Sequence, residues 1–387
     1  MVKYEVSWSQ LTSFRVGGIM PKREVIESEH FTACALNVDG LPESILFVTL
    51  NKDGPQSDGT KKISTYLNSK AYDIMGFSED FNFDTELKSN ITGYTWGTHR
   101  GKITGLSNNT DGLQFACKNS SVTWANESYV AYTSTASTDG NQYVNKGYRH
   151  YDVTIGDQLI DVYITHMDAG SNSSAISSRN KQWKQLTDAI NAVDNGRETP
   201  RPKIVMGDTN CRWTRDGMQE NFINLLNSNF TASDVWVEFY RDGEYPTTDM
   251  SDITDDGNPT NYTNYEIVDK IIYINPTAAN TPQLVPHSFT IEQDYIYDTI
   301  DHDGNTKALG DHKPVVVEFS LVKSGELITL LGDVNRDGKV DIADLTALVN
   351  YLITQEGEYD LDAADMNQDG KVTTDDVEPL VNLLLTE

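Results

Sequence analysis

The chain has 387 residues, of which 38% are hydrophobic and 23% charged, and its formal net charge is −28 at pH 7. This length accommodates one large domain and a second, small one, and without an apolar run of about 18 residues we expect no membrane-spanning segment. Residues 331–387 carry −11 of the charge and the preceding residues −17, which argues against a broad electrostatic grip on nucleic acid, because such binding needs a basic surface.

Apolar runs alternate with helical periodicity along residues 1–325. This alternation predicts an α/β fold with mixed sheets and with helices packed outside them. The expected strands cover residues 31–36, 113–117, 159–164, 203–206, 267–274 and 314–319, and the expected helices cover residues 60–71, 176–193 and 218–226. Cys34 and Cys117 lie inside two of these strands, so we expect both to be buried thiols.

Polar side chains of the same kinds lie in six segments at or next to strand ends, namely residues 36–42, 72–79, 162–170, 204–210, 268–273 and 310–314. They are Asn37, Glu79, His166, Asp168, Asp208, Asn210, Asp269, Asp311 and His312. Ligands collect where the strand ends of an α/β sheet open into loops. Carboxylates, amides and imidazoles are the groups that metal-assisted phosphate hydrolysis needs, because it uses an oxygen-ligated cation, a base for water and donors to phosphate oxygens.

Each of these residues also has a plain structural interpretation. A single His at a strand end is more often a hydrogen-bonded structural residue than a catalyst. The segment Gly207-Asp208-Thr209-Asn210 is also compatible with a simple turn. Asp269 alone is compatible with one hydrogen-bonded buried carboxylate. The order of all six segments along the chain, and their occurrence together, favour the functional interpretation.

In that order the segments resemble the endonuclease/exonuclease/phosphatase superfamily, which includes DNase I, over roughly residues 30 to 320. The sharpest parts are Gly207-Asp208-Thr209-Asn210, Asp311-His312-Lys313-Pro314 and Thr165-His166-Met167-Asp168. The resemblance implies a four-layer α/β sandwich in which two packed sheets are flanked by helices.

The resemblance also implies a role for each site residue. Asn37 and Glu79 would hold Mg²⁺ or Mn²⁺, with Asp311 beside the metal. His312 would be the general base, oriented by Asp269.

On the same resemblance, His166 would donate to the phosphoryl oxygens or protonate the leaving group. Asp208 and Asn210 would position water and phosphate. Asp168 would either serve the site or brace its loop through Arg179.

Two copies of one acidic loop pattern lie 32 residues apart near the C-terminus. Oxygen-bearing side chains fall at loop positions 1, 3, 5, 9 and 12, Gly at position 6 permits a sharp turn, and position 7 needs only a backbone carbonyl. A single run of this kind is compatible with a solvated turn, but two copies in register, each followed by a helical stretch, predict two Ca²⁺ sites. The expected ligands are Asp333, Asn335, Asp337, Lys339, Asp341 and Asp344 in loop 1, and Asp365, Asn367, Asp369, Lys371, Thr373 and Asp376 in loop 2.

Asp in place of Glu at loop position 12, together with the 32-residue period, resembles a type I dockerin over about residues 331 to 387. The resemblance implies a small all-α domain with two EF-hand-like calcium loops, calcium-dependent folding and a cohesin partner on a scaffoldin, as in a cellulosome. In this family loop positions 10 and 11 help to choose the cohesin. Here they are Ile342 and Ala343 in one copy and Thr374 and Asp375 in the other, and this difference argues against symmetric dual-mode docking.

We therefore expect a catalytic domain over residues 1–325 and a dockerin over residues 326–387. The N-terminus lacks the apolar core of a signal peptide. Because a dockerin implies export, we expect that a signal segment was removed. The protein is then extracellular, associated with a scaffoldin or the cell surface, and a monomer before docking.

The predicted function is that of a secreted, divalent-metal-dependent phosphoesterase, and a phosphodiester is the favoured substrate. A lipid, a small molecule and a nucleic acid all remain open as the substrate. A DNase or RNase, the first alternative, predicts a cationic or aromatic groove near Trp96, His99, Arg100 and Lys102. A non-catalytic docking module is the second alternative, and a polysaccharide hydrolase fits less well, because it needs two carboxylates that flank a sugar.

Overall fold

The computed structural model describes residues 28–105, 109–247, 250–252, 265–278, 281–292, 294–295, 299–300, 306–307, 309–322, 331–335, 340–355, 359–367 and 369–385. These residues form two compact units, one within 28–322 and one within 331–385. The boundary predicted at residues 325 and 326 lies outside the described residues and stays a prediction.

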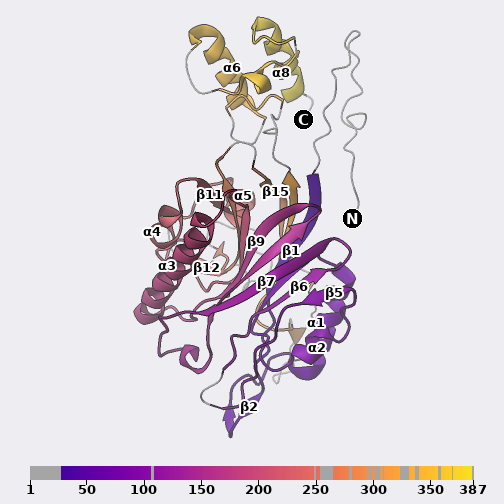
Figure 1. Cartoon of the computed structure of the whole chain (residues 1–387), viewed down its shortest axis with the longest axis vertical. Coiled ribbons are helices and arrows are strands. Elements are labelled where there is room, and N and C mark those ends of the chain that lie inside the picture. The colour runs from indigo at the N-terminus through magenta and orange to yellow at the C-terminus, as the bar shows by residue number, and fades with distance from the viewer. Residues whose placement is uncertain are drawn as a thin grey trace. The chain divides into compact units, whose positions relative to one another are not determined.

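The larger unit contains two six-stranded mixed sheets packed face to face (Figure 1). Sheet I has the order β15 (Gln283–Ile291), β18 (Val315–Val322), β1 (Ser28–Asn37), β4 (Ile74–Ser78), β6 (Gln114–Lys118) and β5 (Tyr94–Trp96). Sheet II has the order β11 (Phe230–Asp234), β14 (Asp269–Pro276), β10 (Lys203–Asp208), β9 (Gln158–His166), β8 (Gly147–Ile155) and β7 (Val122–Ala131).

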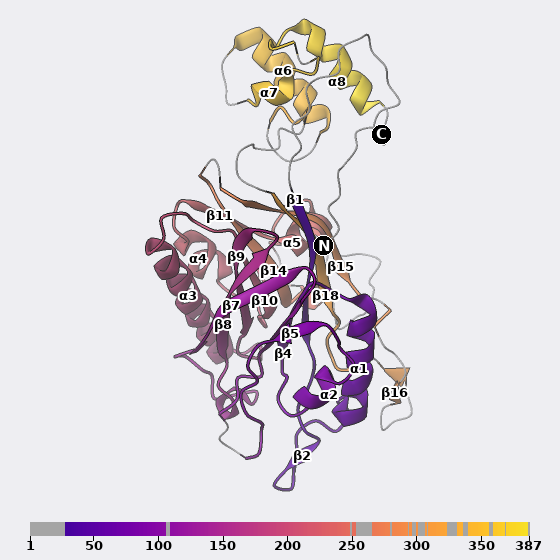
Figure 2. The same cartoon turned by 45° about the vertical axis from the view of Figure 1, so that its right-hand side comes forward.

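Helices cover the outer faces of both sheets, as Figure 2 shows. The helices α1 (Gln56–Lys70) and α2 (Asp84–Lys88) lie on sheet I, and α3 (Ser173–Asn195), α4 (Met218–Asn221) and the 3₁₀ turn η3 (Ile223–Leu225) lie on sheet II. Helix α5 (Val235–Arg241) contacts both β14 and β15 at one edge of the sandwich. The short elements are β2 (Ser44–Ile45), β3 (Val48–Thr49), η2 (Asn141–Tyr143), β12 (Ser251–Asp252), β13 (Tyr265–Glu266), β16 (Thr299–Ile300) and β17 (Thr306–Lys307). The predicted four-layer α/β sandwich is confirmed.

The apolar run of β1 is buried on both faces because successive side chains of a strand point in opposite directions. Phe31, Ala33 and Ala35 belong to the core between the two sheets, whereas Cys34 and Leu36 belong to the core beneath α1. A strand with both faces covered becomes an almost continuous apolar run, and this explains why its position was predictable from the sequence.

The two sheets approach each other closely at their centre. A Cβ atom added at Gly76 of β4 would lie 2.7 Å from Ile164 Cγ2 of β9 and 2.8 Å from Met206 Cε of β10. A side chain at this position would therefore push the sheets apart.

Strand direction places several strand ends at one edge of the sandwich. β1 and β4 run parallel, and so do β9 and β10, with α1 and α3 in the respective connections. β14 and β18 run antiparallel to their neighbours β10 and β1, so the N-terminal ends of β14 and β18 reach the same edge. Polar residues at these six strand ends therefore meet across the sandwich.

Helix α3 illustrates how the sequence fixes one of these connections. The side chain of Asn172 accepts hydrogen bonds from the backbone N–H groups of Ser174 and Ala175, which caps the first turn. Leu186 and Ile190, four residues apart, are buried against sheet II. The helix predicted over residues 176–193 is thus confirmed, with about one more turn than expected.

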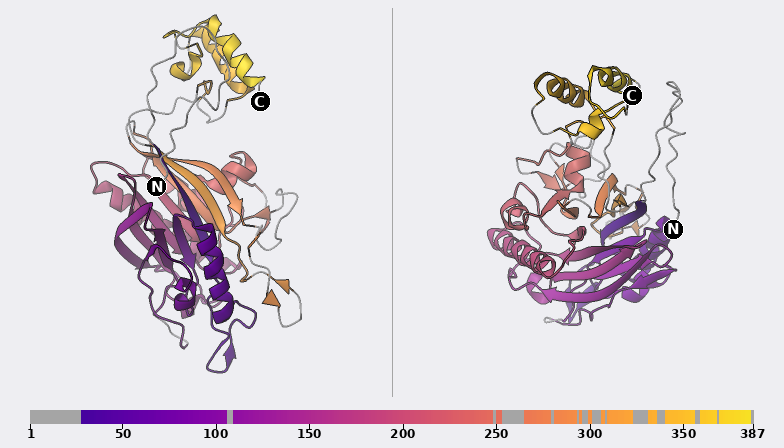
Figure 3. Two further views of the ribbon diagram at one scale, coloured as in Figure 1. Left: turned by 90° about the vertical axis from the view of Figure 1, so that its right-hand side faces the viewer. Right: turned by 45° about the horizontal axis from the view of Figure 1, so that its top comes forward.

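The smaller unit is helical, and its helices are drawn in yellow in both views of Figure 3. It contains α6 (Ile342–Thr354), α7 (Leu361–Ala364), the 3₁₀ turn η5 (Thr374–Asp376) and α8 (Val377–Leu384). Its core is formed by Val334, Ala347, Leu348, Ala364 and Leu380. None of the helices in the described part of the chain has the length and apolarity that a membrane crossing requires.

Candidate active site

Eight residues predicted from the sequence lie at the shared edge of the two sheets. Asn37, Glu79, Asp311 and His312 come from the strand ends of sheet I, and His166, Asp208, Asn210 and Asp269 come from those of sheet II. Asp208 and Asp269 are direct register partners in β10 and β14. The site is therefore divided between the two sheets.

Hydrogen bonds join side chains of opposite sheets. Asn37 Nδ2 donates to Asp208 Oδ2 over 3.1 Å, and His312 Nδ1 lies 2.6 Å from Asp269 Oδ2. All four residues are largely buried, and Asp269 has no exposed surface. These bonds fix the positions of the site residues relative to both sheets.

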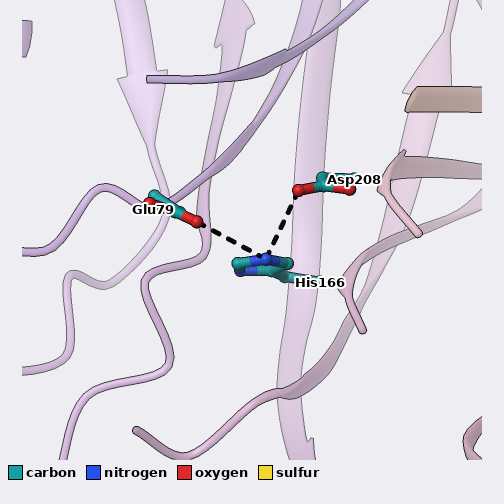
Figure 4. A group of neighbouring side chains, drawn as sticks. All are labelled: Glu79, His166 and Asp208. Carbon is teal, nitrogen blue, oxygen red and sulfur yellow. Dashed lines mark ion pairs between the residues drawn. The ribbon is translucent and has the colours of Figure 1, made fainter. Parts of the chain in front are cut away.

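Glu79, His166 and Asp208 form a candidate metal-binding group at the centre of the site (Figure 4). His166 Nε2 lies 3.7 Å from Glu79 Oε1 and 3.4 Å from Asp208 Oδ2. Asn37 adds an amide next to Asp208. The carboxylate and amide oxygens of this set suit a hard divalent cation.

The electrostatics of the site also fit a cation. Burial, with Asp311 and then Asp208 nearby, raises the pKa of Glu79 to about 7, although Lys146 opposes the shift. Burial, Asp311 and Glu79 raise the pKa of Asp39 to about 8. Carboxylates that disfavour one another's charge in this way are stabilised by a divalent cation between them.

The turn that carries Glu79 is held by close backbone contacts. Glu79 has a φ of 58°, and its carbonyl oxygen accepts hydrogen bonds from Gly40 N at 3.0 Å and Phe81 N at 2.8 Å. A Cβ atom added at Gly40 would lie 2.4 Å from that carbonyl oxygen. Glycine at position 40 is therefore required for this approach.

His312 is arranged as a base. Its Nδ1 donates to Asp269, which leaves Nε2 on the side of the site, 3.8 Å from Asp208 Oδ2 and 3.9 Å from Asp311 Oδ1. Burial opposes protonation, but the carboxylates of Asp269 and Asp208 outweigh it and hold the pKa of His312 well above its usual value. Asp311 is 75% exposed and marks the mouth of the site.

Lys146 is a site residue that the sequence reasoning missed. Its ammonium lies 2.9 Å from His166 Nε2, donates to the carbonyl oxygen of Met167 over 2.8 Å, and is almost fully buried. Burial and then Lys146 lower the pKa of His166 to about 3, so this imidazole is neutral. A lone Lys in a polar stretch gives no periodicity signal, and its partners lie some 20 positions further along the chain.

Asn210 and Asp208 share a tight turn after β10. Asn210 has a φ of 52°, its backbone N–H donates to Asp208 Oδ1 over 2.9 Å, and its amide Nδ2 donates to the carbonyl oxygen of Met167 over 3.2 Å. The hydroxyl of Ser78 accepts a hydrogen bond from Asp208 N over 3.3 Å. The turn thereby brings the β9 and β10 ends together.

Asp168 braces the loop after β9. Its Oδ2 accepts a hydrogen bond from Ala136 N over 2.6 Å, and Arg179 donates to its backbone carbonyl oxygen over 2.8 Å. The carboxylate partner of Arg179 is Asp216, at 2.7 Å. Of the two interpretations left open for Asp168, these contacts support the structural one.

The two C-terminal loops have matching hydrogen bonds. Asp344 accepts from the backbone N–H groups of Asn335 and Asp341, over 3.1 and 2.8 Å. Asp376 accepts in the same pattern from Asn367 and Thr373, over 3.1 and 2.7 Å. Residue 12 of each loop therefore closes the loop onto positions 3 and 9.

The remaining predicted loop residues divide into described and undescribed ones. Asp365 and Asp369 also accept backbone hydrogen bonds within loop 2, and their role as calcium ligands stays a prediction. Asp337 and Lys339 lie outside the described residues. The predicted cohesin-contact residues are all exposed, namely Ile342, Ala343, Thr374 and Asp375.

Comparison with known protein families gives a match in the C-terminal part of the chain. The family "Dockerin type I domain" matches residues 331–385. No curated protein matches the sequence.

Several solved structures are similar to the larger unit. Humanized D. rerio TDP2 with 14 mutations is 17% identical, with a TM-score of 0.50 over 75% of this chain and 98% of that chain. D. rerio TDP2 complexed with a single strand DNA product is 18% identical, with a TM-score of 0.50 and the same coverage of both chains. Sphingomyelinase C from Streptomyces griseocarneus is 13% identical, with a TM-score of 0.49 over 75% of this chain and 99% of that chain. The larger unit thus has a DNase I-like fold, and residues 331–385 form a type I dockerin domain.

Proposed function

We propose that the larger unit is a divalent-metal-dependent phosphodiesterase. The observation that carries this proposal is the hydrogen bond between His312 and Asp269. It orients the imidazole of His312 as a base beside the candidate metal-binding residues Glu79 and Asp208. A base beside a hard-cation site is the arrangement that hydrolysis of a phosphate ester needs.

In this mechanism Asn37 and Glu79 would hold Mg²⁺ or Mn²⁺, with Asp311 beside the metal. The bound cation would polarise a phosphoryl oxygen and offset its developing negative charge. His312 takes the proton from the attacking water at Nε2, and Asp269 stabilises the resulting imidazolium.

The opposite side of the site supplies donors. Lys146 carries hydrogens that can be directed to a phosphoryl oxygen or to the leaving oxygen, and His166 holds its ammonium in place. Asp208 and Asn210 position water and phosphate between these groups and His312.

We also propose that the enzyme is extracellular and binds a cohesin. The dockerin supports attachment to a cohesin of a cellulosomal scaffoldin, and hence an extracellular, secreted protein. Each of the two dockerin loops would bind one Ca²⁺ ion.

Hydrolysis of bis(p-nitrophenyl) phosphate tests the activity. We expect Mg²⁺-dependent turnover by the intact chain that disappears with a chelator and in His312→Ala. His287→Ala is the matched control, because His287 bonds to Ser320 and stacks on His30 at the other end of sheet I. No turnover by the folded wild type on this or on natural phosphodiesters would leave the binding-module alternative.

A phospholipid is the substrate class favoured by one further feature. The β2–β3 hairpin exposes Leu46, Phe47 and Val48, and the Phe47 side chain is fully accessible. Asn51, just after the hairpin, donates a hydrogen bond to Asp39, whose own N–H donates to Asn37 Oδ1 over 2.9 Å. Hydrogen bonds thus connect the apolar hairpin tip to Asn37, a proposed metal ligand. The exposed side chains of the tip can insert into a lipid surface.

The predicted nucleic-acid groove has less support. Trp96 stacks on Phe77, His99 is bonded to the Asp80 carbonyl oxygen, and the Arg100 guanidinium lies over the Tyr129 ring. These side chains are engaged within the protein. Sedimentation with phosphatidylcholine vesicles distinguishes a phospholipid substrate from a nucleic acid. We expect the wild type to bind the vesicles and Phe47→Asp not to bind them. Phe47→Asp should still hydrolyse bis(p-nitrophenyl) phosphate at the wild-type rate.

A further inference from the structure

A second group of metal-ligating side chains lies on the turn that follows Glu79. Asp80, Asp84 and His99 each place one ligand atom within 4.8 Å of the other two. Asp80 follows Glu79 directly, Asp84 is the first residue of α2, and His99 lies in the loop after β5. None of the three has a role in the proposed hydrolysis.

The carboxylate of Asp80 points to a missing ligand. Its side chain is 1% exposed, and within the described residues neither of its oxygens has a hydrogen-bond donor. Burial of an ionised carboxylate without a partner is strongly unfavourable. The facing carboxylate of Asp84 cannot donate to Asp80 unless one of the two takes up a proton. A bound cation removes this conflict without a proton.

Asp84 is oriented for such a cation by its own neighbours. Lys88 Nζ, at 2.5 Å, and Gln114 Nε2, at 3.1 Å, both contact Asp84 Oδ1. This leaves Oδ2 as the ligand atom. The contact with Lys88 joins the last residue of α2 to the first and so restricts the Asp84 side chain.

His99 has the arrangement that metal-ligating histidines adopt. Its Nε2 lies 2.9 Å from the backbone carbonyl oxygen of Asp80, so the imidazole donates from Nε2 and carries its lone pair on Nδ1. A hydrogen bond from one ring nitrogen to a carbonyl fixes the tautomer that binds a metal through the other nitrogen.

Nearby cationic side chains are engaged by carboxylates other than that of Asp80, and Lys88 pairs with Asp84. Arg149 forms ion pairs with Asp111 at 2.8 Å and with Glu127 at 2.9 Å. His150, Asp152 and Asp161 form a similar cluster elsewhere in the larger unit. There the carboxylate of Asp161 contacts His150, Arg197 and Lys203. That cluster is an ion-pair network, whereas the group around Asp80 lacks such a cation on its buried carboxylate.

We propose that Asp80, Asp84 and His99 bind a zinc ion, with water as the fourth ligand. Two carboxylate oxygens and one imidazole nitrogen suit Zn²⁺, whereas Mg²⁺ and Ca²⁺ favour sites made of oxygen alone. The catalytic group differs, because His166 Nε2 accepts a hydrogen bond from Lys146 and leaves only oxygen ligands there. The site is distinct from the catalytic cation site and from the two calcium loops. Its zinc joins three segments: the turn after β4, the start of α2 and the loop after β5. It therefore supports the turn that presents Glu79.

Zinc content of the full chain tests this proposal. The protein is kept in excess Ca²⁺ and Mg²⁺, dialysed to equilibrium against Zn²⁺ and analysed for metal per chain. We expect Asp80→Asn and His99→Gln to retain about one zinc fewer than the wild type. His150→Gln is the matched control and should retain the wild-type amount. Asn37→Ala, which alters the catalytic site on another strand, should keep the zinc that depends on Asp80.

Thermal unfolding of the same samples provides a readout independent of activity. Zinc should raise the unfolding temperature of the wild type and of His150→Gln, but not that of His99→Gln, because a ligand that binds only the folded state stabilises it. His99 lies in a partly exposed loop, so its variant tests the site even if Asp80→Asn folds poorly. Equal zinc content in the wild type, Asp80→Asn and His99→Gln would overturn the proposal. A more stable Asp80→Asn with unchanged zinc content would likewise overturn it, in favour of two carboxyl groups that share a proton.

Discussion

His312 and Asp269 are joined across the sandwich, with His312 Nδ1 2.6 Å from Asp269 Oδ2. His312 precedes β18 of sheet I, and Asp269 begins β14 of sheet II. The orientation and the charge of the proposed base therefore depend on how the two sheets pack, because each sheet supplies one member of the pair.

Substituting Asp269→Asn should move the pH profile of hydrolysis. Although burial opposes it, Asp269 is the first of the carboxylates that hold the pKa of His312 above its usual value. His312 acts as a base only when neutral, so activity rises as the pH passes through its pKa. Without the Asp269 charge this pKa falls, and the ascending limb should shift to lower pH. The plateau kcat should fall by about 10²- to 10⁴-fold, because the imidazolium loses its partner. Steady-state kinetics over pH 5–9 measure both effects, and an unchanged limb would contradict the assignment of His312.

Substituting Lys146→Met should lower kcat by about 10²-fold, the usual size of a lost proton donor or positioned charge. Burial and Lys146 are the two leading causes that depress the pKa of His166, so this pKa should rise towards its ordinary value in the variant. NMR titration of His166 checks the shift separately from turnover. Lys184→Met is the control, because Lys184 forms an exposed ion pair with Asp188. Equal kcat in both variants would remove Lys146 from the site.

Substituting Gly40→Ala should weaken metal binding without removing a functional group. The added Cβ atom would lie 2.4 Å from the carbonyl oxygen of Glu79, so the turn must move and carry Glu79 with it. We expect the Mg²⁺ concentration for half-maximal activity to rise by about tenfold or more, as for other lost supporting contacts of a metal ligand. Gly105→Ala is the control, because a Cβ atom there meets nothing within 4 Å. A wild-type response to Mg²⁺ in Gly40→Ala would show that the turn yields easily.

Substituting Asp161→Asn should destabilise the larger unit. Asp161 has no exposed surface, and its carboxylate contacts His150, Arg197 and Lys203. Removing its charge leaves the buried Lys203 with one carboxylate partner fewer, and the loss should be about 3–5 kcal/mol at neutral pH. Urea unfolding measures it.

The pH dependence of that loss follows from the pKa of Asp161. Burial opposes ionisation, but the hydrogen bonds from His150 and Arg197 and the charge of Lys203 outweigh it, so the pKa of Asp161 in the folded state is lowered. A lowered folded-state pKa contributes stability above the unfolded-state value of about 3.9, and this contribution is lost as the pH falls towards the folded-state pKa. The difference between the wild type and Asp161→Asn should therefore shrink below about pH 4. In contrast, the exposed Asp188→Asn should cost less than about 1 kcal/mol at any pH.

Calcium removal should unfold the dockerin and leave the larger unit folded. Asp344 and Asp376 close their loops through backbone hydrogen bonds, but the other acidic side chains of each loop repel one another without metal. Circular dichroism of residues 326–387 should lose its helical signal in chelator, and cohesin binding should disappear with it. Retention of the signal would show that the apolar core around Leu348 and Leu380 suffices.

The sequence predicted the buried centre of the fold and most of the site for related reasons. Strands with both faces covered are apolar runs, and the predicted residues 159–164 and 203–206 lie inside β9 and β10. A polar residue at the end of such a run contrasts with the apolar residues before it, and His166 and Asp208 were predicted as site residues on this basis. Their roles as catalytic residues stay predictions.

Other elements were missed because they lack this contrast. β7 is an edge strand with mainly exposed residues, and Thr123 and residues 126–128 interrupt its apolar residues, so it forms no continuous apolar run. β8 carries Arg149, whose burial is possible only because Asp111 and Glu127 pair with it from other segments. Lys146 belongs to the same class: a buried charge is recognised by its partners, and those are set by the tertiary fold.

The close approach of the two sheets at Gly76 has a consequence for inactivation. The site takes four residues from each sheet, and its bonds from Asn37 to Asp208 and from His312 to Asp269 span the interface between them. Neither sheet alone retains a competent half of the chemistry. As the denaturant concentration rises, turnover should therefore be lost in the same transition in which the core between the sheets unfolds. Residual hydrolysis then measures the fraction of molecules in which the two sheets remain packed.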